Sequence, residues 1–225
     1  MKRLLALILA VLLLTGCTGD SLSVDVLAED RDFGVFQACA PNAEDANRAC
    51  ALVGAALAEY PEGFCAQWGR VQILLVGSLT GSEQFEHGQF AGFTQKTDTG
   101  WLMVLDAGRC STGTVHHEIS HILDGILTEA GALTEAEWMT FCPKSFAYGS
   151  GSYEDYPDFF ADEYAMENMK EDRARTFEDA MICGAGVYEN RPALWLKLNC
   201  FAQAIRAHFE TENWPEKTAW DEALE

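Results

Sequence analysis

The residues most able to do chemistry lie between positions 115 and 124, in the run Val-His-His-Glu-Ile-Ser-His-Ile-Leu-Asp. His117 and His121 are four residues apart, so on a helix their imidazoles lie on one face and can reach a single zinc ion. Glu118 follows the first of them, where a carboxylate can take a proton from a water bound to the metal. His116 lies one step round the helix and cannot share that metal geometry. The pattern predicts a hydrolytic zinc site.

A helix must hold these side chains, and the apolar residues around them predict one. They recur at steps of four, three and four residues, the spacing of a buried helical stripe: Val115, Ile119, Ile122 and Ile126. Thr112 and Thr114 are available as N-terminal caps, and Gly131 can end the helix. Zinc ligands and a core stripe are therefore compatible on one helix.

A catalytic zinc site needs a third protein ligand, and the acidic candidates lie downstream, in residues 159–178. Glu171 is one candidate, but it follows Asn168 by three residues and could instead be the third helical residue of a capping box. Glu163 and Asp162 are the alternatives. Asp124 lies one turn past His121 on the ligand face, where it could orient an imidazole N–H.

The same downstream segment resembles a known family. Tyr164 stands seven residues before Glu171, which opens the pattern Glu-Asp-x-Ala-x-x-Phe. This spacing resembles the second half of the catalytic domain of anthrax lethal factor, and it is similar to zinc-binding metallopeptidase lipoproteins of gut bacteria. The resemblance covers roughly residues 100–183.

The resemblance implies a role for each matching residue. His117, His121 and Glu171 would bind zinc, and Glu118 would be the general base. Tyr164 would hydrogen-bond the oxyanion of the tetrahedral intermediate or assist the leaving amine.

One position departs from the pattern of lethal factor. Where that protein has a second glutamate one turn after the ligand, this chain has Arg175. The resemblance therefore does not identify the carboxylate that contacts the zinc ligands from outside the metal site. Asp172, Glu178 or Asp124 could supply this contact.

The first 16 residues have the pattern of a signal peptide. Lys2 and Arg3 precede a short apolar run that ends in Leu-Thr-Gly-Cys. This ending resembles the lipobox of bacterial lipoproteins, in which cleavage leaves Cys17 as the lipid-modified first residue. We expect a protein anchored by lipid to a bacterial membrane, at the cell surface or in the periplasm, with residues 17–35 as its tether.

The charge excludes some partners. The chain has 15 basic and 35 acidic side chains, a net charge of −20. Removal of residues 1–16 takes away two basic residues and no acids, so the mature charge is 13 minus 35, or −22. Nucleic acid is not expected to bind so acidic a surface.

Seven cysteines follow Cys17, and in an exported protein they could form up to three disulfides. Cys39 and Cys50 are a plausible pair. The chain has no Cys-x-x-Cys spacing of the kind that indicates a sulfur-ligated zinc site. The cysteines are interpreted as structural.

Residues 36–225 are predicted to form one zincin-like catalytic domain of α+β class, with a small mixed sheet and a helical C-terminal half. The elements expected along it are a helix at 42–60, strands at 70–76 and 101–105 with a hairpin between them, and helices near 134–141 and 192–209. An edge strand near 92–105 could pair with an extended substrate backbone. The glycine-rich segment 148–153 is expected to be a surface loop.

Together these features predict a gluzincin-like zinc peptidase that hydrolyses peptide bonds outside the cytoplasm. Its partners would be a peptide or protein substrate, and a lipid bilayer through Cys17. The alternative is a catalytically silent surface lipoprotein that keeps the zinc fold as a binding or scaffolding module. Glu118 argues against this alternative, because zinc binding alone does not require a carboxylate there.

Overall fold

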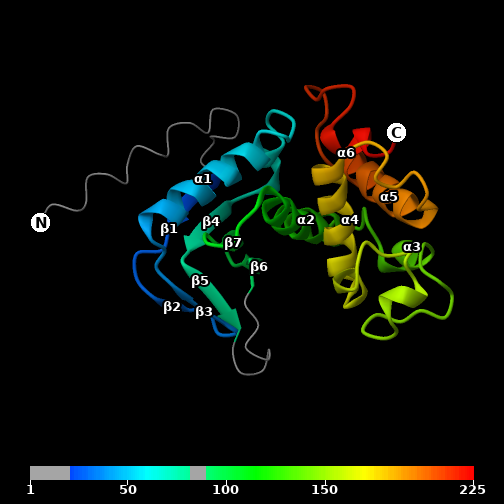
Figure 1. Ribbon diagram of the computed structural model, residues 1–225. Helices are drawn as coiled ribbons and strands as arrows, with labels where there is room; N and C mark the ends of the chain where they lie inside the picture. Colours follow the sequence, from blue (N-terminus) through cyan, green and yellow to red (C-terminus); the bar gives the residue numbers. More distant parts are fainter. Residues whose placement is uncertain (1–20, 82–89) are drawn as a thin grey trace, which may run out of the picture. The chain divides into compact units, whose positions relative to one another are not determined.

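The computed structural model describes residues 21–81 and 90–225, and its contacts divide the chain into two compact units, Met1–Val115 and His116–Glu225 (Figure 1). Strands lie in the first unit and most helices in the second. The predicted α+β class is confirmed. That residues 36–225 act as one catalytic domain stays a prediction. All of the metal-ligand candidates fall in the second unit.

The larger sheet has four strands in the order β1-β4-β7-β6. β1 (Leu22–Val26), β4 (Val71–Val76) and β7 (Gly100–Asp106) are parallel, and β6 (Gly92–Thr97) is antiparallel to β7. β4 and β7 are interior strands with long buried apolar runs, as is usual where both faces of a sheet are covered. β6 lies at one edge, so the edge strand predicted near residues 92–105 is confirmed for β6, whereas β7 is interior.

The position of β1 corrects the predicted tether. Leu22 to Val26 pair with Val71 to Leu75 along the whole strand, and the Leu27 N–H donates to the Leu75 carbonyl at 2.9 Å. Residues from Leu22 onward therefore belong to the folded unit, because their backbone groups complete an edge of the sheet. The predicted signal peptide, Cys17 and the start of the tether lie outside the described residues.

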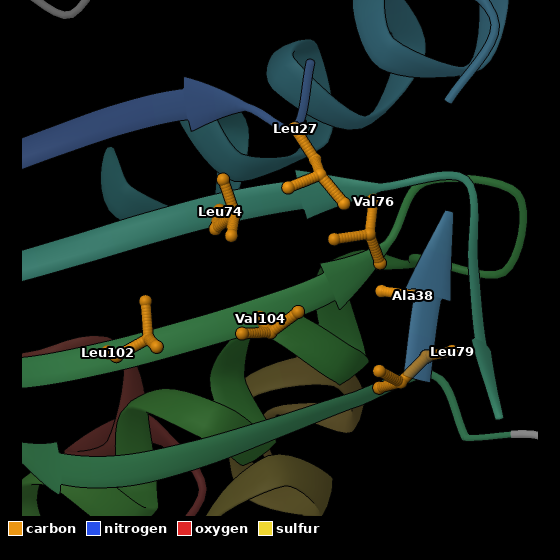
Figure 2. Close-up of a cluster of buried hydrophobic side chains, with 7 residues drawn as sticks. All are labelled: Leu27, Ala38, Leu74, Val76, Leu79, Leu102 and Val104. Atoms are coloured by element: carbon orange, nitrogen blue, oxygen red, sulfur yellow. The ribbon is translucent and has the colours of Figure 1, made fainter. Parts of the chain in front are cut away.

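A smaller antiparallel sheet has the order β2-β3-β5, with β2 at Arg31–Asp32, β3 at Phe36–Cys39 and β5 at Ser78–Gly81. Figure 2 shows side chains from both sheets pointing toward one another in a shared core: Leu27, Ala38, Leu74, Val76, Leu79, Leu102 and Val104. Partly buried phenylalanines extend this core, and Phe36 stacks on Phe93 with ring centroids 4.6 Å apart. Two small sheets thus bury one hydrophobic cluster.

Helix α1 (Ala43–Leu57) contacts β4. It begins after Asn42, whose side chain accepts a hydrogen bond from the Asp45 N–H at 2.9 Å. A short 3-10 turn, η2 (Cys65–Trp68), follows before β4. The helix predicted at 42–60 is therefore confirmed, and it ends at Leu57, three residues before the predicted end.

Helix α2 (Thr112–Glu129) begins in the last residues of the first unit and continues into the second. The second unit also contains the following elements: α3 (Glu135–Met139), η4 (Tyr153–Asp155), η5 (Tyr164–Met166), α4 (Met169–Cys183), α5 (Pro192–His208) and α6 (Ala219–Glu222). α4 contacts η5, α5 and α6. An aromatic cluster joins these helices, with the Phe177 ring 5.4 Å from Phe201 and 5.8 Å from Trp220 between centroids.

The seven described cysteines are all free thiols, so the predicted disulfides are not present in the structure. Cys39 pairs with Ser78 in the strand register, and its sulfur lies 3.1 Å from the Ser78 hydroxyl. The predicted pair of Cys39 with Cys50 is therefore not formed, and the Cys39 thiol contacts Ser78 instead. Among the described residues no helix has the length and apolar character needed to cross a bilayer.

Candidate metal centre

The start of α2 is set by Ser111, which differs from the predicted caps. The Ser111 hydroxyl accepts a hydrogen bond from the Thr114 N–H at 3.0 Å, and the Thr114 hydroxyl accepts one from the Ser111 N–H at 3.3 Å. This reciprocal pair is the arrangement of a capping box. Thr114 thus takes part as the third helical residue, and Thr112 is the first.

The end of α2 follows the prediction for Gly131. Its φ is 70°, its N–H donates to the Thr128 carbonyl, and the next N–H, of Ala132, donates to Leu127. These two bonds form a Schellman motif, which requires a left-handed residue and therefore favours glycine. Between the caps, Val115, Ile119 and Ile122 are buried as predicted, whereas Leu123 and Leu127 complete the buried stripe and Ile126 is only partly covered.

Helix α4 brings a carboxylate to the two histidines of α2. The Asn168 side chain caps α4 by accepting from the N–H groups of Lys170 and Glu171 at 3.0 and 3.1 Å. Glu171 is therefore the third helical residue, as the capping alternative required. Its carboxylate, however, faces the imidazoles: Oε2 lies 3.1 Å from His117 Nε2 and 3.6 Å from His121 Nε2.

These three side chains have the geometry of a metal site. One ligand atom from each of His117, His121 and Glu171 lies within 4.8 Å of the others, and the side chains are only 12–16% exposed. Zinc bonds of about 2.0–2.2 Å in a tetrahedral site place neighbouring ligand atoms about 3.3–3.5 Å apart. Glu171 Oε2 is buried, yet it forms no hydrogen bond of good geometry with any described residue. Convergence of such atoms fits a cation at their centre.

The electrostatics of the site favour positive charge. Burial alone lowers the pKa of His117, but the carboxylates of Glu171, Glu178 and Glu118 outweigh it and raise the pKa to about 10. Burial raises the pKa of Glu171, but contacts with His117 and His121 prevail and hold it well below its usual range. The negative potential that favours a proton on the imidazole also favours a divalent metal ion.

Tyr164 lies beside this group on the short turn η5. Its ring centroid is 6.0 Å from that of His117, and the residue is 41% exposed. Burial of the hydroxyl, together with the charges of Glu171, Glu167 and Glu118, raises its pKa. The hydroxyl therefore stays protonated at neutral pH, so it can donate a hydrogen bond into the site. Glu118 itself is buried, at 4% exposure.

The alternative third ligands are directed elsewhere or lie at the surface. Asp162 accepts from the Ala165 N–H at 2.9 Å and from Arg175 Nε at 2.8 Å. Glu163 is exposed at the start of η5. The structure thus brings Glu171, and neither alternative, to the histidines, and its role as ligand stays a prediction.

Asp124 has a partner other than the one predicted. Its Oδ1 accepts from Arg173 Nη1 at 2.5 Å in a buried ion pair, and from the Thr128 hydroxyl at 3.3 Å. Arg173 also donates to the Thr134 carbonyl and lies over the Trp138 ring. Asp124 therefore joins α2 to α4 and does not orient a histidine, because a buried guanidinium needs a carboxylate more than an imidazole does.

Asp172, a second candidate for the outer contact, also points away from the histidines. Its carboxylate is fully buried with Lys197, at 2.7 Å, and accepts from Trp138 Nε1 at 2.8 Å and from the Tyr148 hydroxyl at 2.6 Å. The Gly149 N–H donates to the Met166 carbonyl. The segment 148–153, expected to be a surface loop, is thus attached at its first residues to α4 and η5.

Glu178 is the carboxylate that reaches the outer side of His117. Its Oε2 lies 3.1 Å from His117 Nδ1, and Arg175 Nη1 donates to the same oxygen. The sequence contained a signal for this contact, because residues seven apart lie on one face of a helix, and Glu178 is seven residues after Glu171. Arg175, which departs from the pattern of lethal factor, is the residue that holds it.

Comparisons with known proteins add one structural relative. No family model matches the sequence, and no curated protein does either. A crystal structure from Bacteroides caccae, of a "putative zinc-binding metallo-peptidase", superposes with a TM-score of 0.57 at 14% sequence identity. The match covers 91% of this chain and 84% of that one. The chain therefore shares its fold with this protein.

Proposed function

We propose that this chain is a zinc-dependent peptidase. The observation that carries the proposal is the convergence of His117, His121 and Glu171, with Glu118 directly after His117 in the sequence. The fold shared with a protein described as zinc-binding and peptidase-like supports it. When bound, zinc would supply an acidic water and polarise the substrate carbonyl.

The residues of the chain then have separate tasks. Glu118 accepts the proton of the attacking water and passes it to the leaving nitrogen. Tyr164, protonated and partly exposed, donates a hydrogen bond to the oxygen on which charge develops. Glu171 completes the metal site from a second helix.

We further propose that the protein acts outside the cytoplasm, attached to a bacterial membrane by lipid on Cys17. The lipobox-like Leu-Thr-Gly-Cys supports this proposal. Fractionation of cells that express wild type or Cys17→Ser tests it. The wild type is expected with the membranes and the variant is expected to leave them; equal distribution of the two would contradict the anchor.

Metal content of the full-length chain tests the zinc site. We expect one zinc per chain in the wild type, lost in Glu171→Ala and retained in Glu163→Ala and Asp162→Ala. Glu163→Ala is the matched control, since it removes an exposed glutamate close to Tyr164. Loss of zinc only with Glu163→Ala or Asp162→Ala would show that this residue, and not Glu171, is the third ligand. A wild type without zinc after reconstitution would favour the binding or scaffolding module.

A further inference from the structure

The His117 ring is contacted through both of its nitrogens by one helix. Glu171 Oε2 lies 3.1 Å from Nε2, and Glu178 Oε2 lies 3.1 Å from Nδ1. The two glutamates are seven residues apart on α4, so they project from the same face two turns apart. A carboxylate at Nδ1 keeps a proton on that nitrogen, so a metal that displaced the proton of Nε2 would meet a lone pair directed toward Glu171 and His121.

Glu178 is itself held by a neighbour on its own helix. The Arg175 guanidinium donates to Glu178 through Nη1 and to Asp162 through Nε, at 2.8 Å for the latter, and its Nη2 lies 3.6 Å from Asp179. The Arg175 side chain is 22% exposed and that of Glu178 is 12% exposed, so these contacts are largely shielded from water. A planar guanidinium holds its N–H groups in a fixed geometry, so it can orient two carboxylates more strictly than the rotatable ammonium group of a lysine.

Asp162 continues this chain of contacts to the turn that carries Tyr164. One of its oxygens accepts from Arg175, and the other accepts from the Ala165 N–H at 2.9 Å. That N–H belongs to the residue after Tyr164, within η5 (Tyr164–Met166). His117 and the Tyr164 turn are thus joined by four consecutive polar contacts, through Glu178, Arg175 and Asp162.

We propose that Glu178 is a positioning residue that orients His117 for the metal, and that Arg175 couples this contact to the Tyr164 turn through Asp162. The proposal rests on the zinc site of the proposed function. Arg175 stands where the resemblance leads one to expect a glutamate. In this proposal it holds the carboxylate of Glu178, three residues further along the helix.

Zinc affinity of the full-length chain tests the first half of this proposal. Loss of an outer carboxylate weakens zinc binding about 10–100-fold. We expect the zinc dissociation constant to rise by this factor in Glu178→Ala, and by less in Glu178→Gln, which keeps an acceptor oxygen for Nδ1–H and loses only the charge. The thermal midpoint in the presence of chelator, measured in parallel, should be close to that of wild type for Glu178→Gln.

The matched control is Asp179→Asn, which removes a carboxylate from the other side of Arg175. We expect its zinc affinity to stay within about twofold of wild type, well below the loss expected for an outer carboxylate. Unchanged zinc affinity in both Glu178 variants would overturn the positioning role. A wild type that binds no zinc would instead contradict the proposed function. Failure of the positioning role and failure of the proposed function are therefore distinguishable.

Hydrogen exchange tests the coupling to Tyr164. In Arg175→Gln, Asp162 loses its guanidinium partner, so we expect faster amide exchange in residues 162–168, together with weaker zinc binding. Exchange in α1, which belongs to the other unit, serves as the internal reference and should not change. Unchanged exchange in 162–168 would overturn the coupling, and unchanged zinc affinity would show that Arg175 does not hold Glu178 in place.

Discussion

Glu118 is proposed as the general base, whereas His117 and His121 are proposed as zinc ligands. Substitution of Glu118 can separate the two roles. Glu118 is 4% exposed and next to a zinc-ligand candidate, but it is not one of the three converging residues. In Glu118→Gln the metal should remain while cleavage of a fluorescence-quenched peptide library falls by at least about 10²-fold, since loss of a general base costs 10²–10⁴. Cleavage at the wild-type rate would contradict the role of Glu118.

Tyr164 offers a second test at the level of single residues. Its pKa is raised, so at neutral pH its hydroxyl is a donor, and in the proposed mechanism it stabilises negative charge developing on the substrate oxygen. Tyr164→Phe should lower kcat about 10²-fold with little change in KM or zinc content, because the lost bond forms mainly in the transition state.

Tyr156→Phe is the matched control for Tyr164→Phe. The Tyr156 ring packs against Phe146 in the hydrophobic cluster that also contains Ala165 and Met166 of the Tyr164 turn, and it is not one of the proposed site residues, so the kcat of this variant should stay at the wild-type value. An equal loss of kcat in both variants would point to a general effect on the fold and would reject the oxyanion role.

At the level of elements, the two helices that carry the ligand candidates are joined by a buried ion pair. Arg173 on α4 and Asp124 on α2 have side chains only 3% and 6% exposed. Asp124→Ala leaves the guanidinium buried without its carboxylate, so it should lower the free energy of unfolding by about 3–5 kcal/mol. Chemical denaturation in the presence of chelator measures this without a contribution from metal.

The double variant Asp124→Leu with Arg173→Met provides the complementary test. A buried pair replaced by apolar side chains often costs little, because the desolvation of both charges is also removed. We expect the double variant to regain most of the stability lost in Asp124→Ala. A double variant as unstable as the single one would show that the pair itself, and not the unpaired charge, determines the loss.

At the level of the whole molecule, the metal should stabilise one unit more than the other. All three ligand candidates belong to the unit that begins at His116. Free zinc at 100 times its dissociation constant should stabilise the folded state by about 2.7 kcal/mol. Hydrogen exchange with and without zinc should show this protection in α2 and α4 and little change in β4 and β7. Equal protection of both units would contradict a site confined to one of them.

Local sequence determined several elements of this protein. The apolar run of β4, the stripe on α2, Asn42 and Asn168 as caps and Gly131 as a helix end all act through contacts a few residues apart. The pairing of His117 with His121 is of the same kind, because four residues on a helix always bring two side chains to one face. For such features a pattern in the sequence is sufficient.

Only the tertiary structure decided which carboxylate serves which partner. Asp124, Asp172 and Glu178 are acids on the two helices that carry the ligand candidates, yet they face Arg173, Lys197 and His117 respectively. Each pairing joins residues 25 to 61 positions apart in the chain, so it depends on how the helices pack and not on spacing within one helix. The structure of residues 22–26 also depended on the fold. Their alternation of polar and apolar residues is compatible with a solvated segment, and they form a strand because β4 pairs with them. The side chains that converge at the centre could therefore be predicted from the sequence, whereas the contacts that orient them required the fold.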